Sequence, residues 1–251
     1  MSDATMQSQR FKELANRSYN NNQYTFTSFL SMAELAEFYE MERELAFACP
    51  KVYGGCEIAE RKMIRFGKEE DLGYVEDFPI VAVIIKPLIS KFSDELNHRD
   101  FLGALMNLGI KRETLGDIFV RNNQACLFCT EAMSEYITKN LTRIKHTSVN
   151  AQIADDVSDI TAPVLEEKIV QIQSERIDAV VAKVYNISRQ DSLEMFPKGL
   201  IYINGRLCTE NAKQLKCDDV VSVRGMGKFT FSEIVNTSKK GKLNCRVMIY
   251  K

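Results

Sequence analysis

Two short motifs contain residue types that could do chemistry. His98-Arg99-Asp100 has the order of a kinase catalytic loop, but the asparagine that this loop needs after four residues is here Asn107, after six. Cys126-Leu127-Phe128-Cys129 could bind zinc together with Cys49 and Cys56. The pair lies in a predicted strand, however, where residues three apart point to opposite faces. We therefore expect Asp100 to be an N-cap, the cysteines to be free thiols, and no metal or cofactor.

Other catalytic spacings are absent from the sequence. It contains no GxGxxG, GxxxxGK[ST] or HExxH pattern and only two histidines, His98 and His146. This favours a protein that is not an enzyme. The alternative is an RNA-modifying enzyme with its active site in residues 76–163, for which Asp100, Asp117 and Cys129 are the candidates. A strongly perturbed carboxylate or thiol would distinguish the two.

Charge is distributed unevenly along the chain. Residues 174–251 hold 14 Lys and Arg against 8 Asp and Glu, a net charge of +6, whereas residues 1–75 carry −3 and residues 76–173 carry −4. A basic module on an acidic remainder is typical of a protein that binds a polyanion, above all nucleic acid. The alternative is a solvated lysine-rich segment without a partner.

Length and composition bound the fold and its location. The chain has 251 residues, 45% of them hydrophobic, which fits two or three small globular domains. The longest apolar run, Ile80–Ile85, is far too short to span a bilayer, and the first residues lack a secretory h-region. Seven cysteines, an odd number, favour free thiols. We expect a cytoplasmic protein without a membrane span, and nothing indicates more than a monomer.

The pattern of the first 163 residues predicts two domains. Residues 1–75 are expected to be mainly helical, with a capping box at Ser31 and Glu34 and a solvated basic helix face over Glu57–Phe66. Residues 76–163 alternate as β-α-β-β-α-β, which predicts an RRM-like ferredoxin plait followed by an acidic linker. Phe119 and Phe128 lie on its central hairpin, where aromatic residues more often belong to the core than to an RNA-stacking face.

Residues 164–251 predict two short helices followed by strands. Ser174 and Ser188 are the expected helix caps, and Asn204-Gly205 is a hairpin turn. The block resembles the S4-type αL RNA-binding domain. Six of that family's sequence elements occur here in order: Arg176-Ile177-Asp178, Ser188-Arg189, Gly199, Ile203-Asn204-Gly205, Asp218-Asp219 and Arg224-Gly225-Met226-Gly227-Lys228. The predicted fold class is thus α+β: a helical segment, a plait, and an S4-type domain.

The S4 resemblance also implies which residues contact RNA. The second helix presents its N-terminal amides and Arg189 to phosphate, which combines the helix dipole with a charged hydrogen bond. Asp178 is expected to be a first-turn acid, rather than the catalytic aspartate of a pseudouridine synthase. Lys228 replaces the family's final arginine, Gln190 a small hydroxyl residue, and Pro197 a polar one, which weakens the expected affinity. The predicted RNA-binding residues are Arg176, Ser188, Arg189, Gln190, Lys198, Asn204, Arg224 and Lys228.

Motifs outside the last block extend the resemblance to the YlmH-type proteins, which carry an S4-type domain after a plait. The matching segments are Gly54-Gly55 with Ala59-Glu60-Arg61-Lys62, His98 to Met106, Leu108 to Glu113, and Gly116-Asp117-Ile118. The resemblance implies a bacterial, ribosome-associated protein that binds rRNA or tRNA on the large ribosomal subunit and serves translation quality control by rescuing stalled ribosomes. The resemblance also implies a link to cell division, because the genes of this family are associated with clusters of division genes. A third hypothesis is therefore a scaffold of the division apparatus, whose acidic half binds protein.

Overall fold

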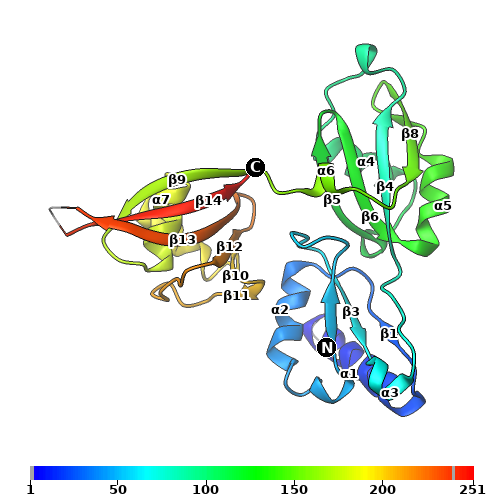
Figure 1. Ribbon diagram of the computed structural model, residues 1–251, viewed down its shortest axis with the longest axis horizontal. Helices are drawn as coiled ribbons and strands as arrows, with labels where there is room; N and C mark the ends of the chain where they lie inside the picture. Colours follow the sequence, from blue (N-terminus) through cyan, green and yellow to red (C-terminus); the bar gives the residue numbers. More distant parts are fainter. Residues whose placement is uncertain (1–2, 239–240) are drawn as a thin grey trace. The chain divides into compact units, whose positions relative to one another are not determined.

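The computed structural model describes residues 3–238 and 241–251 (Figure 1). Its contacts divide the chain into unit 1, residues 1–162, and unit 2, residues 163–251. Both units combine helices with antiparallel sheet, which confirms the α+β class. Among the described residues, no helix has both the length and the apolar character needed to cross a membrane.

The first part of unit 1 is a small helix-and-sheet layer. Its elements are α1 (Asp3–Asn21), β1 (Thr25–Phe26), α2 (Met32–Met41), the 3-10 turn η1 (Ala46–Ala48), β2 (Lys51–Tyr53), β3 (Met63–Phe66) and α3 (Glu69–Leu72). The strands pair in the order β1-β3-β2, and α1 and α2 pack on them through Phe11, Phe38 and Ile64. The predicted capping box starts α2, because the Ser31 amide donates to Glu34 Oε2 at 2.7 Å.

The prediction of a solvated helix face over Glu57–Phe66 is wrong. This segment is a turn followed by β3, whose four residues are all buried. Arg65 is only 6% exposed and lies over the rings of Tyr24 and Phe78, with its guanidinium carbon 4.8 and 5.4 Å from their centroids. The guanidinium of Arg65 is therefore part of the packed interior, because the quadrupole of an aromatic ring attracts a cation that lies over its face.

The second part of unit 1 is the predicted plait. Its elements are β4 (Ile80–Pro87), η2 (Ser90–Phe92), α4 (His98–Asn107), η3 (Arg112–Thr114), β5 (Leu115–Arg121), β6 (Gln124–Thr130), α5 (Glu131–Asn140), β7 (Arg143–Ile144), β8 (Thr147–Ile153) and α6 (Ser158–Thr161). The sheet order β5-β6-β4-β8-β7, with every neighbour antiparallel, is the ferredoxin-like order. Asn122 and Asn123 form the β5–β6 turn with positive φ angles of 50° and 61°.

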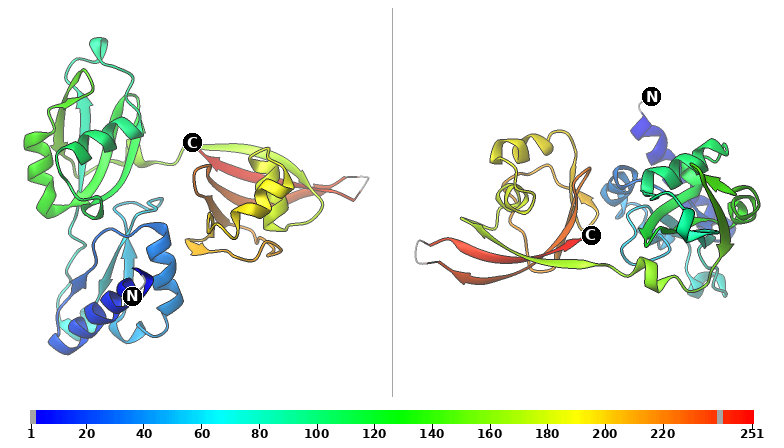
Figure 2. Two further views of the ribbon diagram at one scale, coloured as in Figure 1. Left: turned by 180° about the vertical axis from the view of Figure 1, so that it is seen from behind. Right: turned by 90° about the horizontal axis from the view of Figure 1, so that it is seen from above.

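The two faces of the plait sheet are both covered. Helices α4 and α5 pack on one face, against Val83, Ile85 and Leu127 (Figures 1 and 2). On the other face, Cys126 and Phe128 of β6 are buried, and Ile80, Ala82 and Ile84 of β4 are half-buried. Phe29, Met63 and Cys56 from the first part of unit 1 contact this face, as do Val157 and Ile160 around α6. The prediction that Phe128 belongs to the core is confirmed, and the expected linker contains the short helix α6.

Unit 2 is a six-stranded sheet with two helices on one face (Figure 2). Its elements are β9 (Leu165–Ile172), α7 (Ile177–Val184), α8 (Arg189–Met195), β10 (Ile201–Ile203), β11 (Arg206–Leu207), β12 (Asp219–Val223), β13 (Gly227–Thr237) and β14 (Leu243–Tyr250). They pair in the order β11-β10-β12-β13-β14-β9. The sequence did not predict β9. The prediction that Ser174 caps the first helix is wrong. The N-cap of α7 is Arg176, whose side chain makes no capping hydrogen bond.

Candidate nucleic-acid interface

The start of α7 and the start of α8 meet at one buried carboxylate. Asp178 is 0% exposed and receives hydrogen bonds from two guanidinium groups. Arg176 donates through Nε to Oδ1 at 3.0 Å and through Nη2 to Oδ2 at 3.1 Å. Arg189 donates through Nε and Nη2 to Oδ2 at 3.1 and 3.0 Å. The two arginines lie thirteen positions apart along the chain, and the shared carboxylate holds both of them at the surface.

Local sequence signals explain this geometry. Asn186 adopts a positive φ of 54°, which ends α7 and turns the chain toward α8. Ser188 then starts α8 with a capping box, because its hydroxyl accepts from the Asp191 amide at 3.0 Å while Asp191 accepts the Ser188 amide. Inside, the hydroxyl of the fully buried Ser192 donates to the backbone carbonyl of Asp178 at 2.9 Å. Both helices are thus fixed around the carboxylate.

The electrostatics of this cluster favour the ionised carboxylate. Burial is the largest single influence and raises the pKa of Asp178, but the hydrogen bonds from Arg176 and Arg189 together outweigh it and leave the pKa below its usual value. The arginine side chains remain 36% and 54% exposed. One carboxylate shared by two guanidinium groups leaves a net positive charge that faces water, which suits an anionic partner.

The remaining predicted contact residues are distributed over the same unit. Gln190 is exposed in the first turn of α8. Lys198 is exposed in the turn after this helix, and it pairs with Glu194 at 3.5 Å. Arg224 is exposed in the turn after β12, and its amide donates to the Leu200 carbonyl beyond α8 at 2.8 Å. Lys228 lies over the Tyr250 ring, 4.8 Å from its centroid. The contacts described thus link Arg176 with Arg189 through Asp178, and place Arg224 beside the segment that follows α8.

Two predicted contact residues have evident structural roles. The Ser188 hydroxyl is engaged in the capping box at the start of α8. Asn204 adopts a positive φ of 50° in the β10–β11 turn, accepts the Val220 amide at 2.9 Å, and donates to Asp219 at 2.8 Å. These contacts explain why the pattern requires a hydroxyl residue and an asparagine at these positions, whether or not RNA is present.

Residues that the sequence did not single out add to the basic surface. A cavity of about 450 Å³ beside α7 is lined by Arg189 together with Lys183 and Lys242, and by the amides of Gln171 and Gln173. The role of Asp178 as the shared acceptor was also missed, since the sequence predicted only a favourable interaction with the helix dipole. The available signal was the presence of an arginine at the start of each of two consecutive helices.

The candidate catalytic motif of the plait is a helix start. Asn97, not the predicted Asp100, is the N-cap of α4, because its side chain accepts the Arg99 amide at 2.9 Å. Asp100 completes the capping box and forms an ion pair with Lys145 at 2.7 Å. The pKa of Asp100 is lowered, first by the hydrogen bond from Lys145 and then by the one from the Asn97 backbone.

The cysteine pair lies on a strand, as predicted. Cys126 packs on the face of β6 that the first part of unit 1 covers, whereas Cys129 packs on the face beneath the helices. Burial raises the pKa of each thiol to about 12. All seven cysteines are free, and among the described residues no group of three His, Cys, Asp or Glu side chains is arranged to hold a metal ion.

Two of the segments that carry the family resemblance meet at a junction within unit 1: the segment from Gly54 to Lys62 and the segment from Gly116 to Ile118. Asp117 accepts the amides of Glu60 and Arg61 at 2.5 and 3.1 Å. The Arg61 guanidinium donates to three backbone carbonyls at 2.9 to 3.2 Å, those of Leu115, Phe29 and Arg112. Arg112 adds bonds to the carbonyls of Leu115 and Gly116. Together these contacts tie the first part of unit 1 to the edge of the plait.

Replacement of Arg61 by methionine tests this junction. We expect the free energy of unfolding to fall by about 2 kcal/mol, because partly buried carbonyls lose a charged donor and the methionine stem replaces only the packing. Urea denaturation followed by circular dichroism measures the change. The matched control is Lys51→Met on the exposed side of β2, which should stay within about 0.5 kcal/mol. Equal stability of the two variants would contradict the assigned role.

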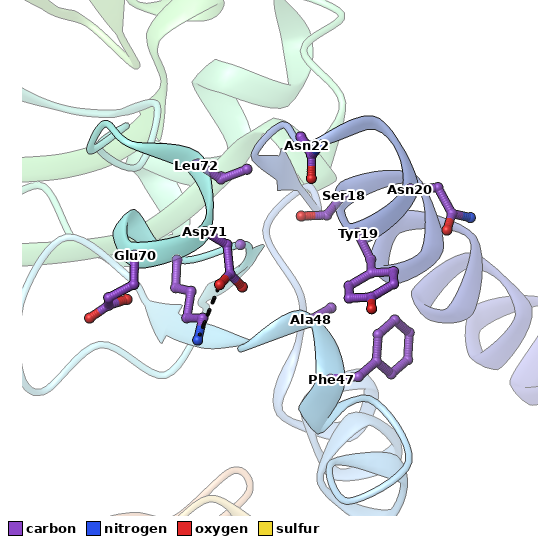
Figure 3. Close-up of a pocket in the computed structure, with 11 residues that line it drawn as sticks. Ser18, Tyr19, Asn20, Asn22, Phe47, Ala48, Glu70, Asp71 and Leu72 are labelled. Atoms are coloured by element: carbon purple, nitrogen blue, oxygen red, sulfur yellow. Dashed lines mark ion pairs between the residues drawn. The ribbon is translucent and has the colours of Figure 1, made fainter.

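The first part of unit 1 contains a further hollow of about 700 Å³, in which Tyr19 and Phe47 meet edge to face with ring centroids 5.5 Å apart (Figure 3). On its other side Lys68 pairs with Asp71 at 3.3 Å, with Glu70 alongside. None of the predicted contact residues lies here. Its mixed charge gives it no preference for a polyanion.

Comparisons with known proteins address the predicted resemblance. Residues 74–156 match the family described as "Putative RNA-binding domain in YlmH". The chain is 29% identical to the ribosome-associated protein quality control protein P2 of Bacillus subtilis (strain 168) over 191 residues. The aligned region covers 75% of this chain and 73% of that protein. The solved cell division protein ylmH from Streptococcus pneumoniae is 18% identical with a TM-score of 0.48, over 61% of this chain and 93% of that one. The family match, which lies on the plait, and the Bacillus subtilis relative confirm the predicted resemblance to the YlmH-type proteins.

Proposed function

We propose that this chain is a non-enzymatic bacterial RNA-binding protein of the cytoplasm. Its ligand is structured RNA, namely rRNA and tRNA on the large ribosomal subunit, and its role is in translation quality control at stalled ribosomes. The observation that carries the proposal is the pair Arg176 and Arg189, held at the surface by the buried Asp178 in the most basic part of the chain. Preorganised guanidinium groups suit phosphate oxygens, because little side-chain entropy is lost on binding.

The comparisons supply the biological context of the proposal. The plait matches a family whose description names RNA binding, and the Bacillus subtilis relative is named for the ribosome and for quality control. Contacts of the kind proposed here position a protein on folded RNA without reading its sequence. They fit a factor that recognises a ribosomal state rather than a particular message.

The residues that an enzyme in the plait would use support the non-enzymatic proposal. A general acid or a nucleophile near neutral pH needs its pKa shifted toward 7. The pKa of Asp100 is shifted down by Lys145, and that of Cys129 is raised by burial to about 12, so both move away from neutrality. Asp117 accepts two backbone amides at the junction within unit 1. Each of these groups has a structural contact that accounts for its position.

The test changes Arg189 and Arg224 together to alanine. We expect affinity for rRNA extracted from Bacillus subtilis large subunits to fall by about 100-fold at low salt, because each lost charged contact contributes about 1.5 kcal/mol. The slope of log affinity against log salt should flatten by about 1.5. Fluorescence anisotropy over a salt series measures both quantities. In cell extracts, the native protein should sediment with large subunits at low salt and leave them at high salt.

The control for this test has the same charge change elsewhere in unit 2. Lys216→Ala with Lys251→Ala removes two exposed lysines outside the predicted contact set and should keep most of the affinity. Since Arg189 also contacts Asp178, circular dichroism must show that the double variant is folded, and Arg189→Lys provides a milder change that keeps the charge. Unchanged RNA affinity in the folded double variant would refute the proposed contact site.

A further inference from the structure

The plait cannot bind RNA on the sheet face that RNA-recognition motifs use. In those domains, aromatic side chains on the two central strands stack on exposed bases. The corresponding strands here are β4 and β6, and the aromatic on β6, Phe128, is only 3% exposed. Phe29, Met63 and Ile160 lie over this face as part of the core of unit 1. Any RNA contact made by the plait must therefore use another surface.

A basic groove lies on the opposite side, at the edge of the helical layer. It has a volume of about 630 Å³ and runs between α4 and the segment that joins α5 to β7. Arg99, Arg143 and Lys145 line it, and all three are exposed. The lining contains one carboxylate, Asp100, which is already paired with Lys145 at 2.7 Å. The charge that remains at the groove is positive, which complements a phosphate backbone.

The other residues of the groove are small or carry amides and hydroxyls. Asn107, Asn140 and Thr142 provide hydrogen-bonding groups that suit the sugar and phosphate edges of RNA. Gly103 lies on the exposed side of α4, and a Cβ atom placed there would meet no heavy atom within 4 Å. A glycine inside a helix is destabilising relative to alanine, and here no packing contact requires it. The lining of the groove therefore has no side chain at this position, and a small one would have open space around it.

We propose that this groove, with Arg99, Arg143 and Lys145 around Gly103, is a second RNA-binding surface that holds the sugar-phosphate backbone of the same RNA. The inference rests on the proposed RNA-binding function and assigns the plait a contact separate from that of unit 2. Unit 2 positions the protein through Arg176 and Arg189, whereas the groove adds phosphate contacts on the helical side of the plait. Two sites on one RNA raise the overall affinity, because the second contact is intramolecular.

The decisive variant is Gly103→Glu in the full chain. Glutamate is a good helix former, so α4 should remain folded while the side chain fills the groove and repels phosphate. We expect affinity for large-subunit rRNA to fall by about tenfold at low salt. Gly103→Ala is the matched control: it should keep the affinity of the native protein and raise Tm by up to about 3 °C. Fluorescence anisotropy and thermal unfolding measure the two properties.

A second variant removes charge without relying on the helix. Arg99→Ala with Arg143→Ala should flatten the slope of log affinity against log salt by about 1.5, because each phosphate contact contributes about 0.7–0.9. The same charge change at Lys86 and Lys139, both exposed on the plait outside the groove, should flatten it much less. The inference is overturned if two folded variants, Gly103→Glu and the double variant Arg99→Ala with Arg143→Ala, bind RNA with the affinity of the native protein and with its slope of log affinity against log salt.

The design separates this inference from the proposed function. If Arg189→Ala with Arg224→Ala loses RNA binding while the groove variants do not, the proposed function stands and the groove is not a site. If the groove variants lose affinity and the unit 2 variant does not, the groove is supported and the contact assigned to unit 2 fails. If both sets bind like the native protein, both assignments fail.

Discussion

Replacement of Asp178 by asparagine is expected to lower the free energy of unfolding by about 3 kcal/mol and to weaken RNA binding in the same protein. Removing one partner of a buried ion pair has effects of this size. Asparagine keeps the shape of the side chain, but it offers an amide hydrogen where the carboxylate accepted from Arg176 or Arg189. An amide nitrogen at the place of Oδ2 removes the acceptor of both Arg189 bonds and of one Arg176 bond, and in either orientation the negative charge that attracts both guanidinium groups is lost. Urea denaturation and rRNA anisotropy measure the two effects.

The pH dependence of this effect has a defined sign. The pKa of Asp178 in the folded protein lies below its unfolded value of about 3.9, so the ionised carboxylate stabilises the fold at pH values above about 4. As pH falls below that value, through the pKa of the folded state, the contribution is lost. The stability difference between native and Asp178→Asn should therefore be constant from about pH 7 to 5 and shrink below about 4.

A nearby surface pair provides the control for Asp178→Asn. Glu194→Gln removes a carboxylate that is 54% exposed and lies 3.5 Å from Lys198 in α8. Exposed pairs at this spacing contribute about 0.5 kcal/mol or less. A loss of similar size in both variants would show that Asp178 acts as an ordinary surface carboxylate and not as the shared acceptor of two arginines.

Replacement of Gly55 by alanine is expected to destabilise unit 1 by about 3–5 kcal/mol. The new Cβ atom would lie 2.3 Å from the Phe128 ring, and Gly55 has a φ of +99°, which side-chain-bearing residues rarely adopt. Overpacking contributes about 1–3 kcal/mol and backbone strain a further 1–3. The ring cannot move away easily, because Phe119 and Met63 pack beside it. Chemical denaturation measures the loss.

Thiol reactivity shows whether the damage is local to this face. Cys126 lies beside Phe128 on the covered side of β6, and burial holds its pKa at about 12, so it should react slowly with a disulfide reagent in the native protein. In Gly55→Ala we expect faster reaction at Cys126 as the covering segment loosens. Gly103→Ala, which meets no neighbour, is the matched control and should be no less stable than the native protein. Native stability in Gly55→Ala would contradict the close packing described for this glycine.

Local signals in the sequence predicted much of the fold. Apolar periodicity predicted the order of the plait. Short-range chemistry predicted the capping box at Ser31, the helix cap at Ser188 and the Asn122-Asn123 turn. The sequence does not predict strand β9, because Glu166, Glu167 and Lys168 interrupt its apolar pattern and most of its residues are not buried. Its eight pairs with β14 form it, and a partner distant in sequence leaves no local signal.

The candidate site was predictable in part for the same reason. The resemblance to S4-type domains named Arg176 and Arg189, but their common acceptor depends on two helices packing together, which residue spacing alone does not reveal. The basic residues over Glu57–Phe66 predict a solvated surface, because side chains such as those of Arg61 and Arg65 are usually exposed. Backbone carbonyls and aromatic rings from other parts of unit 1 satisfy them instead.

The strand order of unit 2 has a consequence for its synthesis on the ribosome. The first strand of the sheet to emerge, β9, pairs only with the last to be translated, β14, which lies between β9 and β13. Until residues 243–250 have left the exit tunnel, β9 has no partner and β13 presents an open edge. The sheet of unit 2 therefore cannot be completed strand by strand during elongation, because β14 must insert between β13 and β9.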